Sequence, residues 1–242
     1  MKKVNLFITC LMDTLFPDAA QAVVDVLEHV GLTVITPKGQ TCCGQPAYNG
    51  GFWEEAQEMA KYNIDLFAPI EGDIVIPSGS CAAMITKHYP DLLKDDPHYG
   101  PKAAALSARV FEFSQYLVDH IKTPDIGAAC SARVVYHPSC HSLRGMGIDR
   151  QPRELLANVR GLQVLEQENP ETCCGFGGVF SVEHPEISAE MLKRKIGNIE
   201  STQAPIAIVA DTGCLMHIQG GLHRQDRPQR VLHIAEVLTH TA

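Results

Sequence analysis

Eight of the nine cysteines in this chain belong to one pattern that occurs twice. Each copy contains a single cysteine, then an adjacent pair followed by glycine, then another single cysteine. The first copy is Cys10, Cys42, Cys43 and Cys81, and the second is Cys140, Cys173, Cys174 and Cys214. Matching cysteines are 130 to 133 residues apart. Such a constant offset indicates an internal duplication, and a period of this length predicts two fused domains and not a solenoid.

The segments around the cysteines repeat as well. Short apolar runs end at Cys10 and Cys140, and residues 73–81 and 206–214 both read as buried strands that end in a turn before the thiol. Helical spacing of apolar residues predicts the following helices: Asp18–His29, Phe52–Phe67 and Glu186–Ile199. Each half is therefore expected to run strand, helix, strand, helix, strand, which favours parallel pairing.

The predicted fold class is α/β, with two pseudo-symmetric Rossmann-like halves and mainly parallel sheets. Residues 1–94 are expected to form the first copy and residues 132–242 the second. The connecting segment, 95–131, is predicted to contain a helix over Ala103–His120.

The predicted topology places the thiols at the carboxyl edges of the sheets. In open α/β sheets, ligands collect beyond the carboxyl ends of the strands. Each single cysteine directly follows a predicted strand, and each Cys-Cys-Gly turn follows the middle strand of its half. We therefore expect the four thiols of each half to meet at one site. Gly44 and Gly175 follow the pairs because aiming two adjacent side chains at one centre needs an unusual turn.

Four soft thiolates per half favour zinc or iron–sulfur chemistry over calcium or magnesium. A closed zinc site typically uses two short Cys-x₂₋₄-Cys knuckles, which this pattern lacks, although zinc stays open as an alternative. Disulfide catalysis is disfavoured because the chain has no Cys-x-x-Cys. The ninth cysteine, Cys130, is expected to be a small buried side chain outside both sets.

Composition excludes several other classes of function. The 242 residues carry 20 basic and 28 acidic side chains, and a net charge of −8 argues against nucleic acid as a partner. No apolar run is long enough for a transmembrane helix, although peripheral membrane contact stays open. The apolar stretch after Lys2 and Lys3 is too short for a signal peptide, so we expect a cytoplasmic protein.

The repeated pattern resembles the cysteine-rich CCG domain family. Its motif runs Cys, about thirty residues, Cys-Cys-Gly, under forty residues, Cys-x-x-Cys. Here the intervals are 31 and 37 residues in the first copy and 32 and 39 in the second. The resemblance covers residues 3–240, and two copies without an added ferredoxin domain are most similar to the lactate-utilisation members of the family.

The resemblance implies a function. The protein would be the non-flavin, iron–sulfur electron-transfer subunit of a complex that oxidises L-lactate to pyruvate, together with two further subunits. Its eight cysteines would hold one or two iron–sulfur clusters of the [4Fe–4S] type. Two alternatives stay open: a heterodisulfide reductase-like thiol/disulfide redox subunit that acts at its cluster, and a zinc-bound structural CCG protein. No catalytic residue is assigned.

The chain departs from the family at the last motif cysteine. The final Cys-x-x-Cys is replaced by Cys81-Ala82-Ala83-Met84 and by Cys214-Leu215-Met216-His217. Four thiols per half suit a cubane cluster, so we do not expect the non-cubane cluster associated with five cysteines. His217 is a candidate fifth ligand that would hold the metal of the second half more firmly. Arg144 is a candidate for offsetting cluster charge, whereas His137 is expected only to shape the turn before Cys140.

Overall fold

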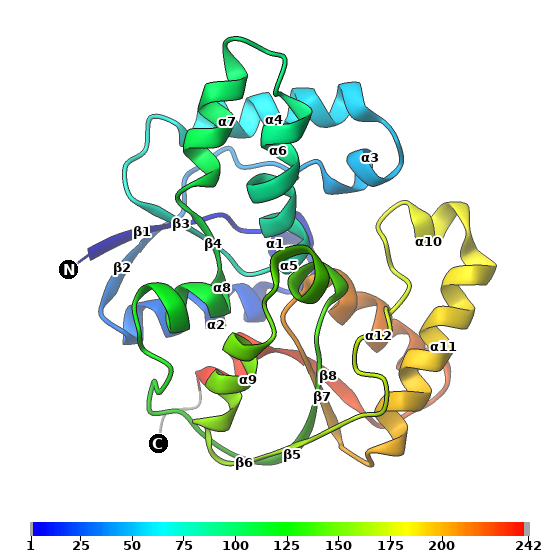
Figure 1. The fold of residues 1–242 in the computed structure, drawn as a ribbon. Helices are drawn as coiled ribbons and strands as arrows, with labels where there is room; N and C mark the ends of the chain where they lie inside the picture. The colour runs from blue at the N-terminus through cyan, green and yellow to red at the C-terminus, as the bar shows by residue number, and fades with distance from the viewer. Residues whose placement is uncertain (1, 240–242) are drawn as a thin grey trace.

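Two parallel four-stranded sheets form the framework of the protein, whose computed structural model describes residues 2–239 (Figure 1). The strand orders, β2-β1-β3-β4 and β6-β5-β7-β8, are equivalent in the two halves. The strands are β1 Lys2–Leu6, β2 Leu32–Ile35, β3 Asp73–Ile76, β4 Val110–Glu112, β5 Ala129–His137, β6 Arg160–Leu165, β7 Ile206–Val209 and β8 Arg230–His233. The predicted α/β fold with two equivalent halves is confirmed.

Helices surround both sheets. In the first half they are α1 Cys10–Leu15, α2 Pro17–His29, α3 Gln45–Asn49, α4 Trp53–Phe67, α5 Gly79–Ala83, η1 Met84–His88, α6 Tyr89–Leu92, α7 Tyr99–Ser107, α8 Phe113–Gln115 and η2 Tyr116–His120. In the second half they are η3 His141–Gly145, α9 Arg150–Ala157, α10 Phe180–Glu183, α11 Pro185–Ser201, α12 Thr212–Arg224 and α13 Ile234–Leu238. The three segments η1, η2 and η3 have π-helical geometry. The helices predicted from apolar spacing correspond to α2, α4 and α11, with ends that differ by one or two residues.

The predicted helix over Ala103–His120 is wrong. In the structure α7 ends at Ser107, and Val110–Glu112 forms β4, which pairs with β3 (Ile74 opposite Val110). Pairing with a buried neighbouring strand overrides the local helical periodicity here, because main-chain hydrogen bonds and burial outweigh propensity. Each half therefore has four strands where the sequence predicted three. The expected outer limits of the two copies, residues 1 and 242, lie outside the described residues.

The alternating apolar residues of the strands build layers on both sides of each sheet. In the first sheet, Ile74 and Ile76 pack against a cluster that includes α4, whereas Val75 faces the cluster between the two sheets. In the second sheet, Val209 packs toward α11 and α12 and Ile208 faces the central cluster. A period of two is what a strand buried on both faces requires.

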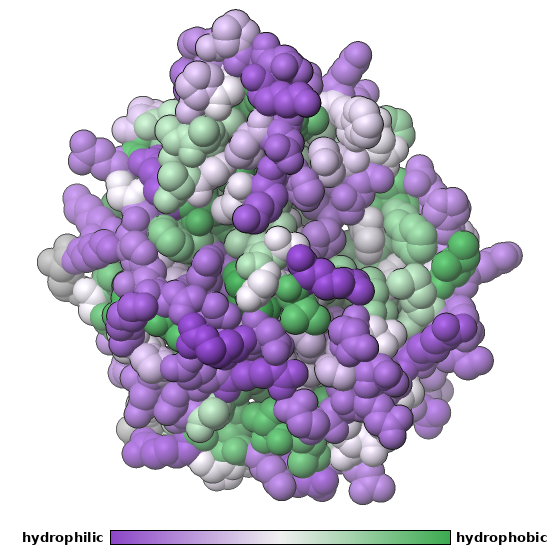
Figure 2. Space-filling view, in the orientation of Figure 1, coloured by the Kyte–Doolittle hydropathy of each residue, from purple (hydrophilic) through white to green (hydrophobic). Residues whose placement is uncertain are grey.

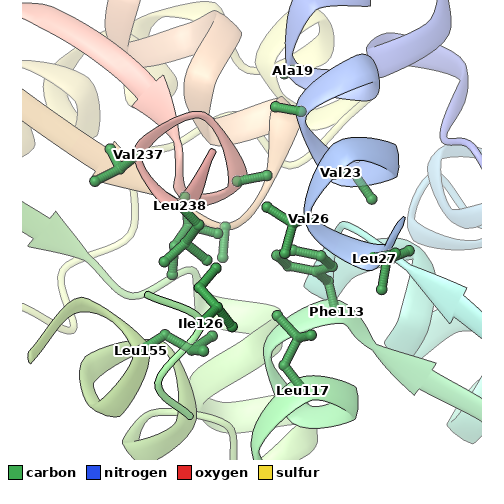
Figure 3. Packing of buried hydrophobic residues seen from close by; sticks show 14 of the residues in the cluster. Ala19, Val23, Val26, Leu27, Phe113, Leu117, Ile126, Leu155, Val237 and Leu238 are labelled. Atoms are coloured by element: carbon green, nitrogen blue, oxygen red, sulfur yellow. The ribbon is translucent and has the colours of Figure 1, made fainter. Parts of the chain in front are cut away.

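The central cluster joins the two halves into one hydrophobic core. Val26 of α2 points toward Leu238 of α13, with Phe113 and Leu117 packed beneath Val26 and with Val23 one turn earlier in α2 (Figure 3). All five side chains are at most 1 % exposed. Because strands and helices of both copies bury their apolar side chains in this one cluster, the halves are not independently packed units.

Polar groups also cross between the halves, close to the ends of the strands. The carboxylate of Asp211 is buried and accepts hydrogen bonds from Ser78 Oγ and Ser80 N at 2.9 Å and from Gly213 N at 3.0 Å. Ser78 and Asp211 are the residues that precede α5 and α12, so one carboxylate connects the starts of the two equivalent helices.

The outer surface is mostly hydrophilic. Figure 2 shows one such face, with a more hydrophobic area over α10 and α11, where Val182 and Ile187 are exposed. Within residues 2–239, none of the helices has the length and apolar character needed to cross a membrane.

A close approach at Gly79 generates the first prediction. A Cβ at this residue would lie 1.9 Å from Ser142 Oγ and 2.9 Å from Ser142 N of the other half. Gly79→Ala should therefore force the halves apart and lower the free energy of unfolding by roughly 2–4 kcal/mol. Gly197→Ala, on the exposed face of α11 with no atom near its Cβ, is the control and should stabilise by roughly 0.5–1 kcal/mol. Urea unfolding measures both, and equal effects would contradict the argument.

Two buried ionisable groups give opposite dependences of stability on pH. Glu112 and His233 end the equivalent strands β4 and β8, and each caps the helix that follows. Burial raises the pKa of Glu112 to about 7 and lowers the pKa of His233 to about 4. Between about pH 4.5 and pH 7 Glu112 is ionised in the unfolded chain but stays protonated in the folded protein, so its burial destabilises the fold as the pH rises from about 4.5 to 7. Between about pH 6.5 and pH 4 His233 is protonated in the unfolded chain but stays unprotonated in the folded protein, so its burial destabilises the fold as the pH falls from about 6.5 to 4.

Substitution should reveal each contribution separately. Relative to the parent protein, Glu112→Gln should gain stability as the pH rises from about 4.5 to 7, and His233→Asn should gain it as the pH falls from about 6.5 to 4. Each change should approach roughly 3 kcal/mol across its window. Asparagine also caps helices well, so His233→Asn keeps the cap. Urea midpoints of the metal-free protein measure the curves, and curves parallel to the parent's would contradict the assignment.

Candidate metal centre

The eight cysteines of the repeated pattern line one cavity of about 150 Å³. The single cysteines follow strands directly: Cys10 begins α1 after β1, Cys81 lies in α5 after β3, Cys140 precedes η3 after β5, and Cys214 lies in α12 after β7. The adjacent pairs lie in the loops that follow β2 and β6. The structure therefore brings each set of four together at the carboxyl edge of its sheet. It also brings the two sets to a shared cavity, whereas the sequence led us to expect two separate sites.

We call the two sets the first quartet (Cys10, Cys42, Cys43 and Cys81) and the second quartet (Cys140, Cys173, Cys174 and Cys214). All of these cysteines are free. Cys43 Sγ lies 3.2 Å from Cys81 Sγ in the first quartet, and Cys174 Sγ lies 3.4 Å from Cys214 Sγ in the second. Two thiolates on one tetrahedral metal, with bonds of about 2.3 Å, lie about 3.8 Å apart. Both observed distances are shorter than this, so the inner sulfur atoms would have to move apart to bind a metal, and it is the soft donor set that suits a metal or an iron–sulfur group.

Each Cys-Cys-Gly turn depends on its glycine. Gly44 and Gly175 have φ angles of 86° and 91°, and their N–H groups point at Cys42 Sγ and Cys173 Sγ at 3.5 and 3.4 Å. A Cβ on Gly175 would lie 2.7 Å from the backbone oxygen of Ser188. The glycines thus permit both the left-handed turn and a backbone donor beside the first thiol of the pair.

The leading cysteine of each pair is the thiol most easily ionised. Hydrogen bonds from Cys10 and Cys43 lower the pKa of Cys42 to about 3, and hydrogen bonds from Cys140 and Cys174 lower the pKa of Cys173 to about 2. The neighbouring thiols give up the proton less readily, because each donates to a thiolate. Thiolates are the metal-binding form of cysteine, so each quartet has one donor ready at neutral pH.

His137 lies behind the second quartet, whereas the sequence predicted for it only a role in shaping the turn before Cys140. Its imidazole is 1 % exposed, and a ring nitrogen and the sulfur atoms of Cys174 and Cys214 all lie within 4.8 Å of one another. Burial lowers the pKa of His137 to about 3, with nearby Lys195 acting in the same direction, so the imidazole is neutral. A signal was present in the repeat itself: the equivalent residue, three positions before Cys10, is Phe7.

A buried lysine distinguishes the second half further. Lys195 Nζ donates to Gln167 Oε1 at 3.1 Å and to the carbonyl of Pro170 at 3.0 Å. Burial lowers the pKa of Lys195 to about 8, and thiolates of the second quartet oppose that shift. Gly44 packs on Ala56 of α4 and Gly175 packs on Ser188 of α11, so Ala56 and Ser188 are equivalent positions in the two halves. Counting seven residues on from each shows that Asn63 in α4 is the equivalent of Lys195 in α11. The first half has a neutral amide where the second has a cation.

The remaining predicted residues occupy varied positions. His217 Nε2 lies 3.3 Å from Ser188 Oγ, with its ring 5.8 Å from that of Phe176, and its role as a metal ligand stays a prediction. Arg144 is exposed in η3. Cys130 lies near the start of β5, outside both quartets, but it is only half-buried and lines a different surface cavity, where a fully buried side chain was expected.

His141 is a second residue of the site that was not predicted as a ligand. Its ring lines the shared cavity, with Nδ1 3.6 Å from Cys140 Sγ and Nε2 3.2 Å from Gln45 Nε2 of the first half. It therefore connects the second quartet to the start of α3, which follows the first Cys-Cys-Gly turn.

The turn glycines generate a graded prediction. Gly175→Ala should be the more damaging change, because its Cβ would meet backbone, whereas on Gly44 the nearest atom is the Met59 Cβ at 3.3 Å. We expect losses of roughly 2–3 kcal/mol for Gly175→Ala and roughly 1–2 kcal/mol for Gly44→Ala. Urea unfolding with parallel cobalt(II) uptake measures both. Full uptake by Gly175→Ala would contradict the role assigned to the turn.

The two repeated segments match a known family of protein domains. The model of a family described as "CCG: Cysteine-rich domain" matches the chain at residues 4–86 and 134–219. The chain is 47 % identical to Lactate utilization protein A of Exiguobacterium sp., covering 98 % of this chain and 97 % of that one. It is 46 % identical to the protein of the same name from Halalkalibacterium halodurans, with the same coverage of both chains. Among solved structures, glutamate racemase from Bacillus anthracis gives a TM-score of 0.39 at 11 % identity, covering 98 % of this chain and 79 % of that one.

Proposed function

This chain belongs to the cysteine-rich CCG domain family, and we propose that it is the iron–sulfur electron-transfer subunit of a complex that oxidises L-lactate to pyruvate. The observation that carries the proposal is the convergence of eight free thiols on one cavity. Similarity over the full chain to proteins named for lactate utilisation supports L-lactate as the substrate of the complex. The protein would work in the cytoplasm with two further subunits.

The residues of the cavity suit this role. The first and second quartets would each hold a [4Fe–4S] cluster through four thiolates. Such clusters supply one-electron uptake and release. Gly44 and Gly175 direct N–H groups at the leading thiols and so stabilise their negative charge. The buried inner thiols (Cys43, Cys81, Cys174 and Cys214) keep the inner edge of the site away from water.

Lactate oxidation removes two electrons and two protons, and this chain carries only part of that process. Its cavity is lined mainly by thiols and small side chains, and the lining residues within the described range 2–239 include the carboxylate of Asp211 but no lysine or arginine that could bind the carboxylate of lactate. The sequence also has no Gly-x-Gly-x-x-Gly that opens a helix after a strand. We therefore assign lactate binding and the first acceptance of electrons to a partner subunit. The role of this chain is to receive and pass on electrons.

One observation favours a second candidate function. The first and second quartets share a cavity, and His141 of the second half contacts Gln45 of the first half there. A heterodisulfide reductase-like subunit, which cleaves a disulfide at its cluster, would need a small substrate to reach the metal in such a cavity. Growth on lactate separates this candidate from the electron-transfer subunit.

If both cysteine quartets are needed for electron transfer from lactate, their loss should be visible in growth. Deleting the gene should abolish growth on L-lactate in a strain that lacks other lactate dehydrogenases. Restoring the gene with Cys174→Ser should fail to rescue growth, because the second quartet loses a buried ligand while a chain of this length keeps its core without metal. Cys130→Ser is the matched control and should rescue fully. Growth of the Cys174→Ser strain at the parental rate would contradict the proposal.

Metal analysis of the same variants provides the biochemical control. Anaerobically purified protein should contain iron and sulfide, with the Mössbauer and EPR signatures of cubane [4Fe–4S] clusters. Cys174→Ser should lose the second cluster, and Cys130→Ser should match the parent. Stoichiometric zinc would instead favour a structural CCG protein, and a non-cubane signature would contradict the four-thiol cluster.

A further inference from the structure

Phe7 and His137 occupy equivalent places in the two halves. Each lies three residues before the first cysteine of its quartet, after or at the end of the equivalent strands β1 and β5. Both side chains are 1 % exposed. Phe7 stacks on Phe67 with ring centroids 5.5 Å apart, which is an ordinary packing role for an aromatic ring. An imidazole fills the same place in the second half.

The imidazole of His137 has no hydrogen-bond partner at either nitrogen among the described residues. Burying an unpartnered polar group costs free energy, and buried polar groups are nearly always hydrogen-bonded. A phenylalanine fits at the equivalent residue without this cost. The polar ring at His137 therefore needs a partner that the polypeptide does not provide.

The surroundings of His137 identify the kind of partner. One ring nitrogen and the sulfur atoms of Cys174 and Cys214 lie within 4.8 Å of one another, and all three side chains are buried. Within residues 2–239, no other set of three His, Cys, Asp or Glu side chains brings its ligand atoms this close together. Neutral imidazole and thiolate are both ligands for iron and zinc.

We propose that His137 is a nitrogen ligand of the metal group held by the second quartet. The second centre then has a mixed sulfur and nitrogen donor set, whereas the first centre has sulfur donors only. The inference rests on the proposed function only in requiring that the quartets bind metal. It does not depend on lactate as the substrate.

Two other histidines near the second quartet already have polar neighbours. His217 Nε2 lies 3.3 Å from Ser188 Oγ, and His141 Nε2 lies 3.2 Å from Gln45 Nε2. His137 differs from both in lacking a partner and in lying against the two inner thiols. His217→Ala is therefore the matched control, since His217 is the ligand expected from sequence alone.

A nitrogen ligand changes the chemistry of the second centre. Imidazole is neutral, so adding it to four thiolates leaves the formal charge of the centre unchanged, and the centre becomes less negative only where His137 takes the place of one thiolate on the metal. Replacing thiolate by histidine raises the reduction potential of iron–sulfur centres. Where His137 takes the place of a thiolate, the second centre should be easier to reduce than the first.

The direct test is nitrogen coupling to the metal. Reduced, anaerobically purified protein is studied by pulsed EPR, with natural histidine and with ¹⁵N-histidine. The parent should show a histidine nitrogen coupling that the label alters, His137→Phe should lose it, and His217→Ala should retain it. The substitution His137→Phe reproduces the residue of the first half, so it should fold. If the metal is zinc, cobalt(II)-substituted protein serves for the same measurement.

A second measurement separates a ligand from a structural residue. His137→Phe should raise the midpoint of thermal unfolding of metal-free protein by roughly 3 °C, because it removes an unpartnered imidazole. The same change should weaken cobalt(II) binding to the second quartet by at least roughly tenfold. A purely structural role would change the thermal midpoint and leave the affinity unaltered.

The outcomes distinguish this proposal from the function proposed above. Coupling that persists in His137→Phe, or a metal-loaded parent without any histidine coupling, overturns the role of His137 and leaves the thiol centres standing. Coupling lost only in His217→Ala transfers the role to His217. Protein that binds neither iron, zinc nor cobalt(II) overturns both proposals.

Discussion

The carboxylate of Asp211 holds the starts of α5 and α12 together, and the arrangement of the thiols depends on that contact. It accepts hydrogen bonds from Ser78 and Ser80 of one half and from Gly213 of its own half. A buried carboxylate satisfied in this way is costly to disturb, because every donor would be left without a partner. Since Cys81 and Cys214 lie on the two helices concerned, the contact turns two separate sheet edges toward one cavity. The shared core between the two sheets then fixes their relative position.

The sequence was most informative where one simple period governs the structure. Apolar spacing located α2, α4 and α11, because each of these helices buries a single face against a sheet. The strands before Cys81 and Cys214 were evident as short apolar runs, and parallel pairing then places every thiol at the same edge. The duplication made both inferences firmer, since each element was observed twice. Fold class and the membership of each quartet followed from these regularities.

Features that depend on contacts between distant segments could not be predicted in the same way. The strand Val110–Glu112 exists because β3 offers it a partner, and no local period reveals that. The common cavity depends on Asp211 and on the close packing of Gly79 against Ser142, which are separated by at least 63 residues of chain. His137 is different, because comparing the two copies residue by residue exposes it. A duplicated chain provides its own reference, and the positions where the copies disagree in polarity indicate specialised chemistry.

The two halves have the same fold, but they differ in buried charge because Asn63 in the first half is equivalent to Lys195 in the second. Both side chains are fully buried in equivalent helices, so they differ in charge and hardly in placement. A fixed cation in a medium of low polarisability acts over several ångströms and is poorly screened by salt. Negative charge that enters the molecule is therefore more stable on the side of α11 than on the side of α4. Gene duplication produced two halves with the same fold, and the buried cation of Lys195 makes the second half the more favourable place for negative charge.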